Sequence, residues 1–198
     1  MLNTLIHFIS FLIKLDKPHS QTSESERLLL ATLARESNCL VEIGVFEGLV
    51  TRILAENSSD NSIVYGIDPF FRGRVGICWS LFIAKIYLNV YIQKDKIRLL
   101  RGLSPGSGHL VLGLVDFVFL DGDHSYVGLK DDWEYWSDRL VEGGIVALHD
   151  VFRVDSKPDS YHLGSFDFFE EVILLDDRFE FLFQRDSMAV LRKVKGII

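Results

Sequence analysis

Short apolar segments alternate along the chain with segments whose apolar residues recur every three or four positions. The short apolar segments predict strands at 39–45, 62–68, 96–102, 115–123 and 144–150. The segments between them predict helices at 26–37, 49–57, 77–92, 126–140 and 165–176. Residues 179–193 predict a terminal hairpin around a Gln-Arg-Asp turn. Because strands that are apolar along their length and alternate with helices form covered parallel sheets, we predict an α/β fold. Its doubly wound, mostly parallel seven-stranded sheet would end in a C-terminal antiparallel hairpin.

The first 22 residues form a separate feature, an apolar N-terminal extension and linker. Residues 2–15 carry nine large apolar side chains, too few to span a bilayer, which takes about 20 residues. They lack the basic start and small-residue cleavage pattern of a secretory signal, so we expect a cytoplasmic protein. We predict a short helix that packs on the domain or on a partner subunit, with membrane-surface contact as the alternative. Residues 16–22 read as a linker, and a capping box at Ser23 and Glu26 then opens a single domain over 23–198.

Composition narrows the class of protein further. The chain has 198 residues and a formal net charge of −7, which disfavours a nucleic-acid surface. Its two cysteines, Cys39 and Cys78, lie in apolar segments and cannot supply a disulfide scaffold. An apolar N-terminal stripe on an acidic domain also suggests a homodimer, because the stripe needs a surface to cover it.

Polar residues gather where the predicted strands end, which is the edge at which open α/β sheets bind ligands. The first strand runs into the turn Glu42-Ile43-Gly44-Val45-Phe46-Glu47-Gly48, in which Phe46 stands where a dinucleotide fingerprint requires glycine. No P-loop pattern follows either, so a ligand without a pyrophosphate is favoured. Asp68 ends the second strand, where a carboxylate could accept hydrogen bonds from ribose hydroxyls. The alternative is structural: the glycines make a tight turn and Asp68 caps the next segment.

Four motifs together resemble a known family. E-I-G-V-F-E-G, Y-G-I-D, F-L-D-G-D-H-S-Y and G-G-I-V-A-L-H-D look like the class I S-adenosylmethionine-dependent methyltransferases, whose fold is Rossmann-like. The D-G-D-H-S-Y signature is most similar to the macrocin-type sugar O-methyltransferases. The resemblance implies that S-adenosylmethionine is the cofactor and that its binding residues are Glu42, Gly44, Gly48, Asp68, Gly102, Ser104 and Asp121. Leu103 departs from the family, which often has an acidic residue there to take the adenine amino group.

A second group of polar residues ends the fourth and fifth strands. Asp121, Asp123, His124, His149 and Asp150 should converge there, and crowded carboxylates favour a bound cation. The region is similar to the metal-dependent catechol-type O-methyltransferases, which implies Asp121, His149 and Asp150 as ligands of Mg²⁺ or Mn²⁺. The same similarity makes His124 the base for a substrate hydroxyl, with Asp121 beside it. The structural alternative is that Asp123 and His124 cap the following helix, on which Asp131 and Asp132 are expected to be solvated.

The leading interpretation is a methyltransferase that acts on a hydroxyl of a small molecule, such as a sugar or a natural product. A metal-dependent hydrolase or oxygenase using the His and Asp cluster is one alternative. A non-catalytic methyltransferase-like protein is another. Residues 151–165 are the best candidate for a substrate lid, with Asp155 and Tyr161 as candidate contacts.

Overall fold

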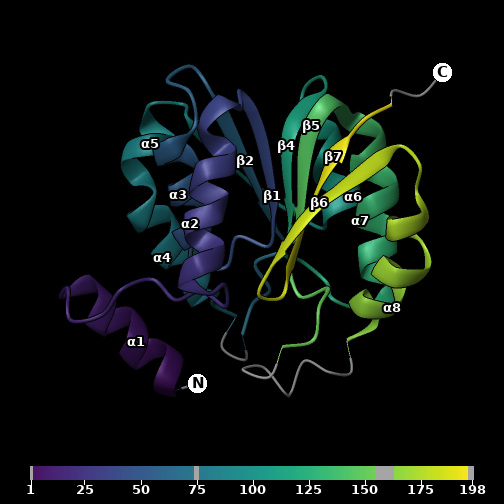
Figure 1. Cartoon of the computed structure of the whole chain (residues 1–198). Helices are drawn as coiled ribbons and strands as arrows, with labels where there is room; N and C mark the ends of the chain where they lie inside the picture. Colours follow the sequence, from purple (N-terminus) through teal and green to yellow (C-terminus); the bar gives the residue numbers. More distant parts are fainter. Residues whose placement is uncertain (1, 74–75, 155–162, 196–198) are drawn as a thin grey trace.

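The computed structural model describes residues 2–73, 76–154 and 163–195, which form one mixed sheet with helices on both faces (Figure 1). The strand order is β3-β2-β1-β4-β5-β7-β6, parallel except where β7 pairs with β5 and with β6. The strands are β1 (Cys39–Ile43), β2 (Ile63–Asp68), β3 (Ile97–Arg101), β4 (Val115–Leu120), β5 (Leu140–Leu148), β6 (Phe179–Arg185) and β7 (Met188–Lys193). The predicted fold class is confirmed, including the terminal antiparallel hairpin.

Helices cover the sheet in two groups (Figure 1). They are α1 (Leu2–Leu12), α2 (Glu24–Leu33), α3 (Leu49–Asn57), α4 (Trp79–Tyr87), α5 (Asn89–Gln93), α6 (Ser104–Ser107), α7 (Tyr126–Arg139) and α8 (Gly164–Glu171). On one face, Leu30 of α2 and Leu54 of α3 pack with Phe117 and Phe119 of β4. On the other face, α7 and α8 bury Trp133, Trp136, Phe168 and Phe169 against the sheet. The strands read as continuous apolar segments because both faces of the sheet are covered.

Several boundaries differ from the sequence prediction, and the structure explains two of the differences. The single helix expected over 77–92 is two helices, because the chain turns at Leu88, whose buried side chain packs against Gly48. The fifth strand begins at Leu140 rather than Gly144. Gly143 has a φ of +82°, and the pairing with β4 shifts register between Val115 and Phe117, so the two glycines bend the strand without ending it.

The N-terminal helix α1 lies beside the domain, near the carboxyl ends of the strands (Figure 1). It contacts α4 through Phe8, whose ring centroid lies 4.9 Å from that of Trp79. Several of its large apolar side chains are exposed, among them Ile6 and Ile9. Among the described residues, no helix has the length and apolar character needed to cross a membrane.

Candidate functional site

A cavity of about 670 Å³ opens at the carboxyl ends of β1, β2, β3 and β4. Seven of the predicted site residues line it: Glu42, Gly44, Asp68, Gly102, Ser104, Asp121 and His124. Three do not. Gly48 starts α3 in a left-handed conformation and packs on Leu88, while His149 and Asp150 are buried behind the cavity wall. Seven of the ten proposed site residues thus line the cavity, and the other three lie in the structure around it.

Gly44 lets β1 and β4 end close together at the base of the cavity. Its φ is +92°, and a Cβ atom there would lie 2.0 Å from the carbonyl oxygen of Asp121. Its N–H donates to the carbonyl of Ile67, and the N–H of Asp121 donates to that of Ile43, each at 2.9 Å. Only glycine tolerates both the backbone angle and this contact.

Asp68 organises two loops around the cavity. Its carboxylate accepts the N–H of Phe46 at 2.9 Å and the N–H of Phe70 at 2.6 Å. The first of these contacts reaches across from the β1–α3 turn, and the second is the local cap considered in the sequence analysis. Each carboxylate oxygen keeps acceptor capacity for a ligand hydroxyl, so the structural and binding roles are compatible.

Glu42 is a buried carboxyl group at the cavity wall. The hydroxyl of Thr51 donates to it. Burial raises the pKa of Glu42 well above its ordinary value, and the nearby charges of Asp121 and Asp68 raise it further. Its surroundings therefore favour the neutral carboxyl form over the carboxylate.

The far wall of the cavity is formed by the segments after β2 and β3 and by α7. Leu103 and Phe71 are both exposed and supply apolar surface there. The hydroxyl of Ser104 accepts a hydrogen bond from the indole of Trp136 at 2.8 Å. Asp132 also lines the cavity, and it is buried rather than solvated as the sequence analysis expected.

Asp132 could have been found from the helical pattern. It falls on the same face of α7 as the buried Leu129, Trp133 and Trp136, at helical spacing. Burial raises its pKa to about 6, against the lowering effect of a hydrogen bond with Ser104. A carboxyl group that changes charge near neutral pH therefore faces the ligand cavity.

His149 lies in a chain of alternating acidic and basic groups. Its Nδ1 is 2.7 Å from Asp121 Oδ1 and 3.5 Å from Asp150 Oδ2, and its Nε2 is 3.3 Å from Glu26 Oε2. Burial by itself lowers the pKa of His149, but the interactions with Asp121, Glu26 and Asp150 override it and raise the pKa to about 10. These interactions favour the protonated form of the ring, an imidazolium held between carboxylates.

The predicted metal ligands Asp121, His149 and Asp150 lie together, and a protonated His149 competes with a metal ion for this position. An imidazolium carries protons on both nitrogens and has no lone pair for a cation. The positive charge that crowded carboxylates require is already supplied by His149. Asp121, His124 and His149 place one candidate ligand atom each within 4.8 Å, but His149 would first have to lose its proton.

His124 stands at the cavity end of this chain. Its Nε2 lies 3.5 Å from Asp121 Oδ1, and its side chain is 20% exposed. Its carbonyl accepts the N–H of Ser165, which fixes the start of α8 beside it. The N-cap of α7 is Ser125, whose hydroxyl accepts the N–H of Gly128, so His124 does not cap that helix.

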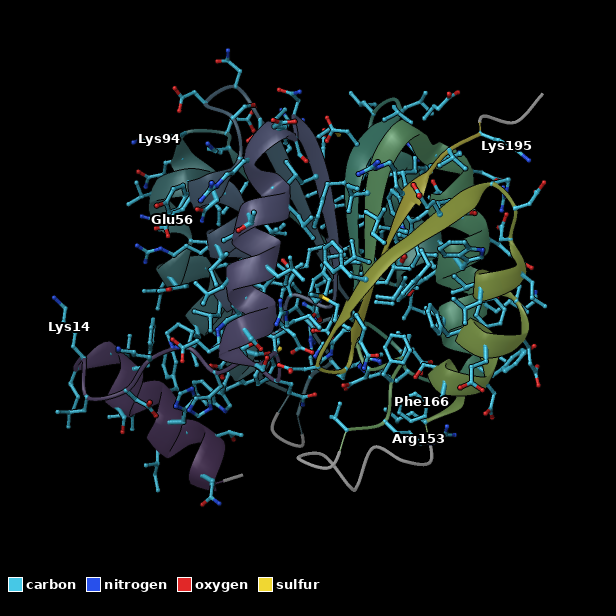
Figure 2. All side chains as sticks on the ribbon, in the orientation of Figure 1. Lys14, Glu56, Lys94, Arg153, Phe166 and Lys195 are labelled. Carbon is cyan, nitrogen blue, oxygen red and sulfur yellow. The ribbon has the colours of Figure 1, made fainter. Side chains whose placement is uncertain are left out.

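The N-terminal linker is part of the cavity wall. His19, Ser20 and Gln21 line the cavity, although the sequence analysis treated residues 16–22 only as a connection. Arg153 and Phe166 do not belong to the cavity lining. The guanidinium carbon of Arg153 lies 4.8 Å from the centroid of the Phe166 ring (Figure 2). The candidate lid residues Asp155 and Tyr161 lie outside the described residues.

The fold and the cavity define a doubly wound domain whose cavity lies at the carboxyl ends of its central strands, where such folds bind their ligands. A family model described as a methyltransferase domain matches residues 41–151. The chain therefore belongs to this methyltransferase family, as its motifs indicated. No curated protein sequence matches the chain.

Solved structures of methyltransferases share the whole fold. An O-methyltransferase from Bacillus cereus in complex with SAH aligns with a TM-score of 0.70 and 18% identity, over 98% of this chain and 91% of that one. The O-methyltransferase TomG from Streptomyces achromogenes, involved in tomaymycin synthesis and in complex with SAM, aligns with a TM-score of 0.69 and 17% identity, over 97% of this chain and 90% of that one. A SAH-bound methyltransferase from Podospora anserina aligns with a TM-score of 0.69 and 16% identity, over 97% of this chain and 88% of that one. At these sequence identities, the structural similarity shows that the proteins share a fold.

Proposed function

We propose that the protein transfers the methyl group of S-adenosylmethionine to a hydroxyl oxygen of a small molecule. One observation carries the proposal: the Asp68 carboxylate and the Gly44 turn face one cavity together with His124 and Asp121. The first pair suits the ribose and methionine parts of the cofactor, and the second pair suits removal of a proton. The cofactor-bound structures of similar fold support the choice of cofactor.

S-adenosylmethionine supplies an electrophilic methyl group on a sulfonium sulfur. In our proposal Asp68 accepts hydrogen bonds from the ribose, and the backbone around Gly44 and Gly102 lets the cofactor approach closely. Leu103 and Phe71 offer apolar surface to the adenine.

His124 is the proposed base for the acceptor. Its ring takes the proton of the acceptor hydroxyl, and the oxygen forms a bond to the methyl carbon as the bond from carbon to sulfur breaks. Asp121, 3.5 Å from His124 Nε2, stabilises the imidazolium that results. His149 pairs with Asp121 from behind and is itself paired with Glu26.

Binding and transfer experiments on matched variants test this proposal. We expect calorimetric titration to show saturable binding of S-adenosylhomocysteine, weakened roughly tenfold to hundredfold in Asp68→Asn through loss of a charged acceptor. The exposed Asp177→Asn is the control and should bind like the unaltered protein. His124→Gln should keep the affinity and lose methyl transfer by about 100-fold or more. Absence of binding in the unaltered protein would refute the proposal, and full activity of His124→Gln would remove His124 from it.

The remaining predictions concern the cellular location and the oligomeric state of the protein. We propose that it acts in the cytoplasm, because Cys39 and Cys78 are free thiols as a reducing compartment maintains. We also propose a homodimer, supported by the exposed apolar side chains on α1, including Ile6, Ile9 and Leu12. A monomer mass in analytical ultracentrifugation at micromolar concentration would contradict the dimer.

A further inference from the structure

A second cluster of histidines and carboxylates lies at the rim of the cavity, apart from Asp121. His7 comes from α1, Asp16 and His19 from the linker, and Glu47 from the turn between β1 and α3. The rings of His7 and His19 stack, with centroids 3.7 Å apart and an angle of 14° between their planes. The N-terminal segment and the turn after β1, which are distant in sequence, thus bring their polar side chains to one point.

Three of these residues place ligand atoms together. One ligand atom each from His7, His19 and Glu47 lies within 4.8 Å of the others. His7 Nε2 is 2.9 Å from Glu47 Oε2, and the backbone N–H of His19 donates to the same oxygen at 2.6 Å. Ligands about 2.0–2.1 Å from a tetrahedral zinc ion lie about 3.3 Å from one another, close to the separation of His7 Nε2 and Glu47 Oε2. The His19 ring, which stacks on that of His7, would turn so that its nitrogen reaches the same ion.

The opposite nitrogen of His7 shows the arrangement typical of a metal-bound histidine. Nδ1 lies 2.7 Å from Asp16 Oδ2 and donates its proton to this carboxylate, while Nε2, which faces Glu47 Oε2 at 2.9 Å, would release its proton when a metal ion binds. Histidine ligands commonly donate their second N–H to a carboxylate, which fixes the tautomer and the ring orientation. Asp16 Oδ2 also lies 3.5 Å from His19 Nε2, so the same carboxylate contacts both histidines.

The cluster is also sheltered. The side chain of Glu47 is 5% exposed and that of His7 is 12% exposed, while that of His19 is 56% exposed. Two donors are therefore held within the protein and the third closes the group from the solvent side. Burying such polar groups is costly unless strong interactions compensate, and a bound cation would provide them.

We propose that His7, His19 and Glu47 bind a divalent transition metal, with Asp16 orienting His7. Two imidazoles and one carboxylate are a donor set that zinc accepts, with the fourth position left to water. Because His19, Ser20 and Gln21 line the cavity, the metal would fix the N-terminal segment along its rim. The proposal concerns this rim alone and does not depend on the transferred group.

Metal titration of the full chain tests the site. The protein is stripped with a chelator and titrated with Zn²⁺ against a chromophoric competitor, and with Co²⁺ to record the visible bands of tetrahedral coordination. We expect one tight equivalent, weakened at least about 100-fold in His19→Ala, because even a residue that only orients a ligand commonly contributes 10–100-fold. His19 is the residue of choice because its exposed side chain can be removed with little effect on folding. His109→Ala removes an exposed histidine elsewhere and should leave the affinity unchanged.

Two results would overturn the proposal. One is a full chain that binds neither ion, which would make the cluster a set of ion pairs. The other is metal binding that survives in His19→Ala but is lost in His124→Ala, which would place the ion at Asp121 instead. Glu47→Gln provides the second ligand variant, and it should weaken Zn²⁺ binding while circular dichroism confirms that the chain is folded.

Discussion

Replacing His149 tests the electrostatic core of the structure. In His149→Gln the carboxylates of Glu26, Asp121 and Asp150 lose the imidazolium that lies between them. A rise in pKa from 6.5 to about 10 corresponds to about 5 kcal/mol of interaction in favour of the imidazolium. Removing one partner of a buried ion pair costs about 3–5 kcal/mol, so the two estimates agree. We expect the variant to lose about 3–5 kcal/mol of unfolding free energy.

The loss should depend on pH in a defined direction. Because the folded-state pKa of His149 is raised, its contribution is complete below about 6.5 and is lost as pH rises through about 10. Burial raises the pKa of Glu26, but hydrogen bonding to His149 outweighs this and lowers it to about 2. The contribution of Glu26 is therefore complete above about 4.5 and is lost as pH falls through about 2. The difference between the two proteins should be largest between pH 4.5 and 6.5.

Urea unfolding followed by tryptophan fluorescence at pH 5.5 and at pH 10 measures this difference. The control is His109→Gln, an exposed histidine whose replacement should change the unfolding free energy by no more than about 0.5 kcal/mol. The double variant Glu26→Gln, His149→Gln should be less destabilised than the sum of the single variants, since the two groups interact directly. A loss below about 1 kcal/mol at pH 5.5, or one that does not shrink by pH 10, would refute the reasoning.

The remaining predictions concern the cavity. Gly44→Ala should cost at least about 2 kcal/mol more unfolding free energy than Gly143→Ala, because both have a positive φ but only Gly44 lacks room for a Cβ atom. Equal losses in urea unfolding would contradict this. The pKa of Asp132 is raised from 3.8 to about 6, so the group stabilises the folded state below pH 3.8 and this contribution is lost as the pH rises through 6. Asp132→Asn should therefore remove up to about 3 kcal/mol of the pH dependence of the unfolding free energy. Unfolding curves at pH 4 and 7 test it, and a variant that follows the unaltered protein at both would refute it.

The sequence predicted the strands and the position of the cavity because both follow from local patterns. A buried parallel strand is apolar along its length, and its carboxyl end is marked by the first polar residue, as at Asp68 and Asp121. The parallel register then brings these ends together. The predicted cavity residues Gly44, Asp68 and Asp121 follow directly from that geometry.

The ion-pair partners could not be predicted in the same way. Glu26 was recognised as half of a capping box, but its carboxylate also accepts the N–H of Ser187 and pairs with His149, contacts that depend on how α2 docks against the sheet. The meeting of His7 with Glu47 depends likewise on the path of the linker. Hydrophobic patterns determine which face of an element is buried, and they carry no information on which polar groups meet at its ends.

The two phenylalanines that donate to Asp68 have a consequence for the kinetics of ligand binding. Phe46 and Phe70 have φ angles of +52° and +46°, a conformation that costs a non-glycine residue about 1–2 kcal/mol. The hydrogen bonds to Asp68 hold both loops in this conformation before any ligand arrives. A ligand that meets a loop already in its final shape loses little conformational entropy on binding. Association should then follow a single concentration-dependent phase, without a slower step of loop ordering.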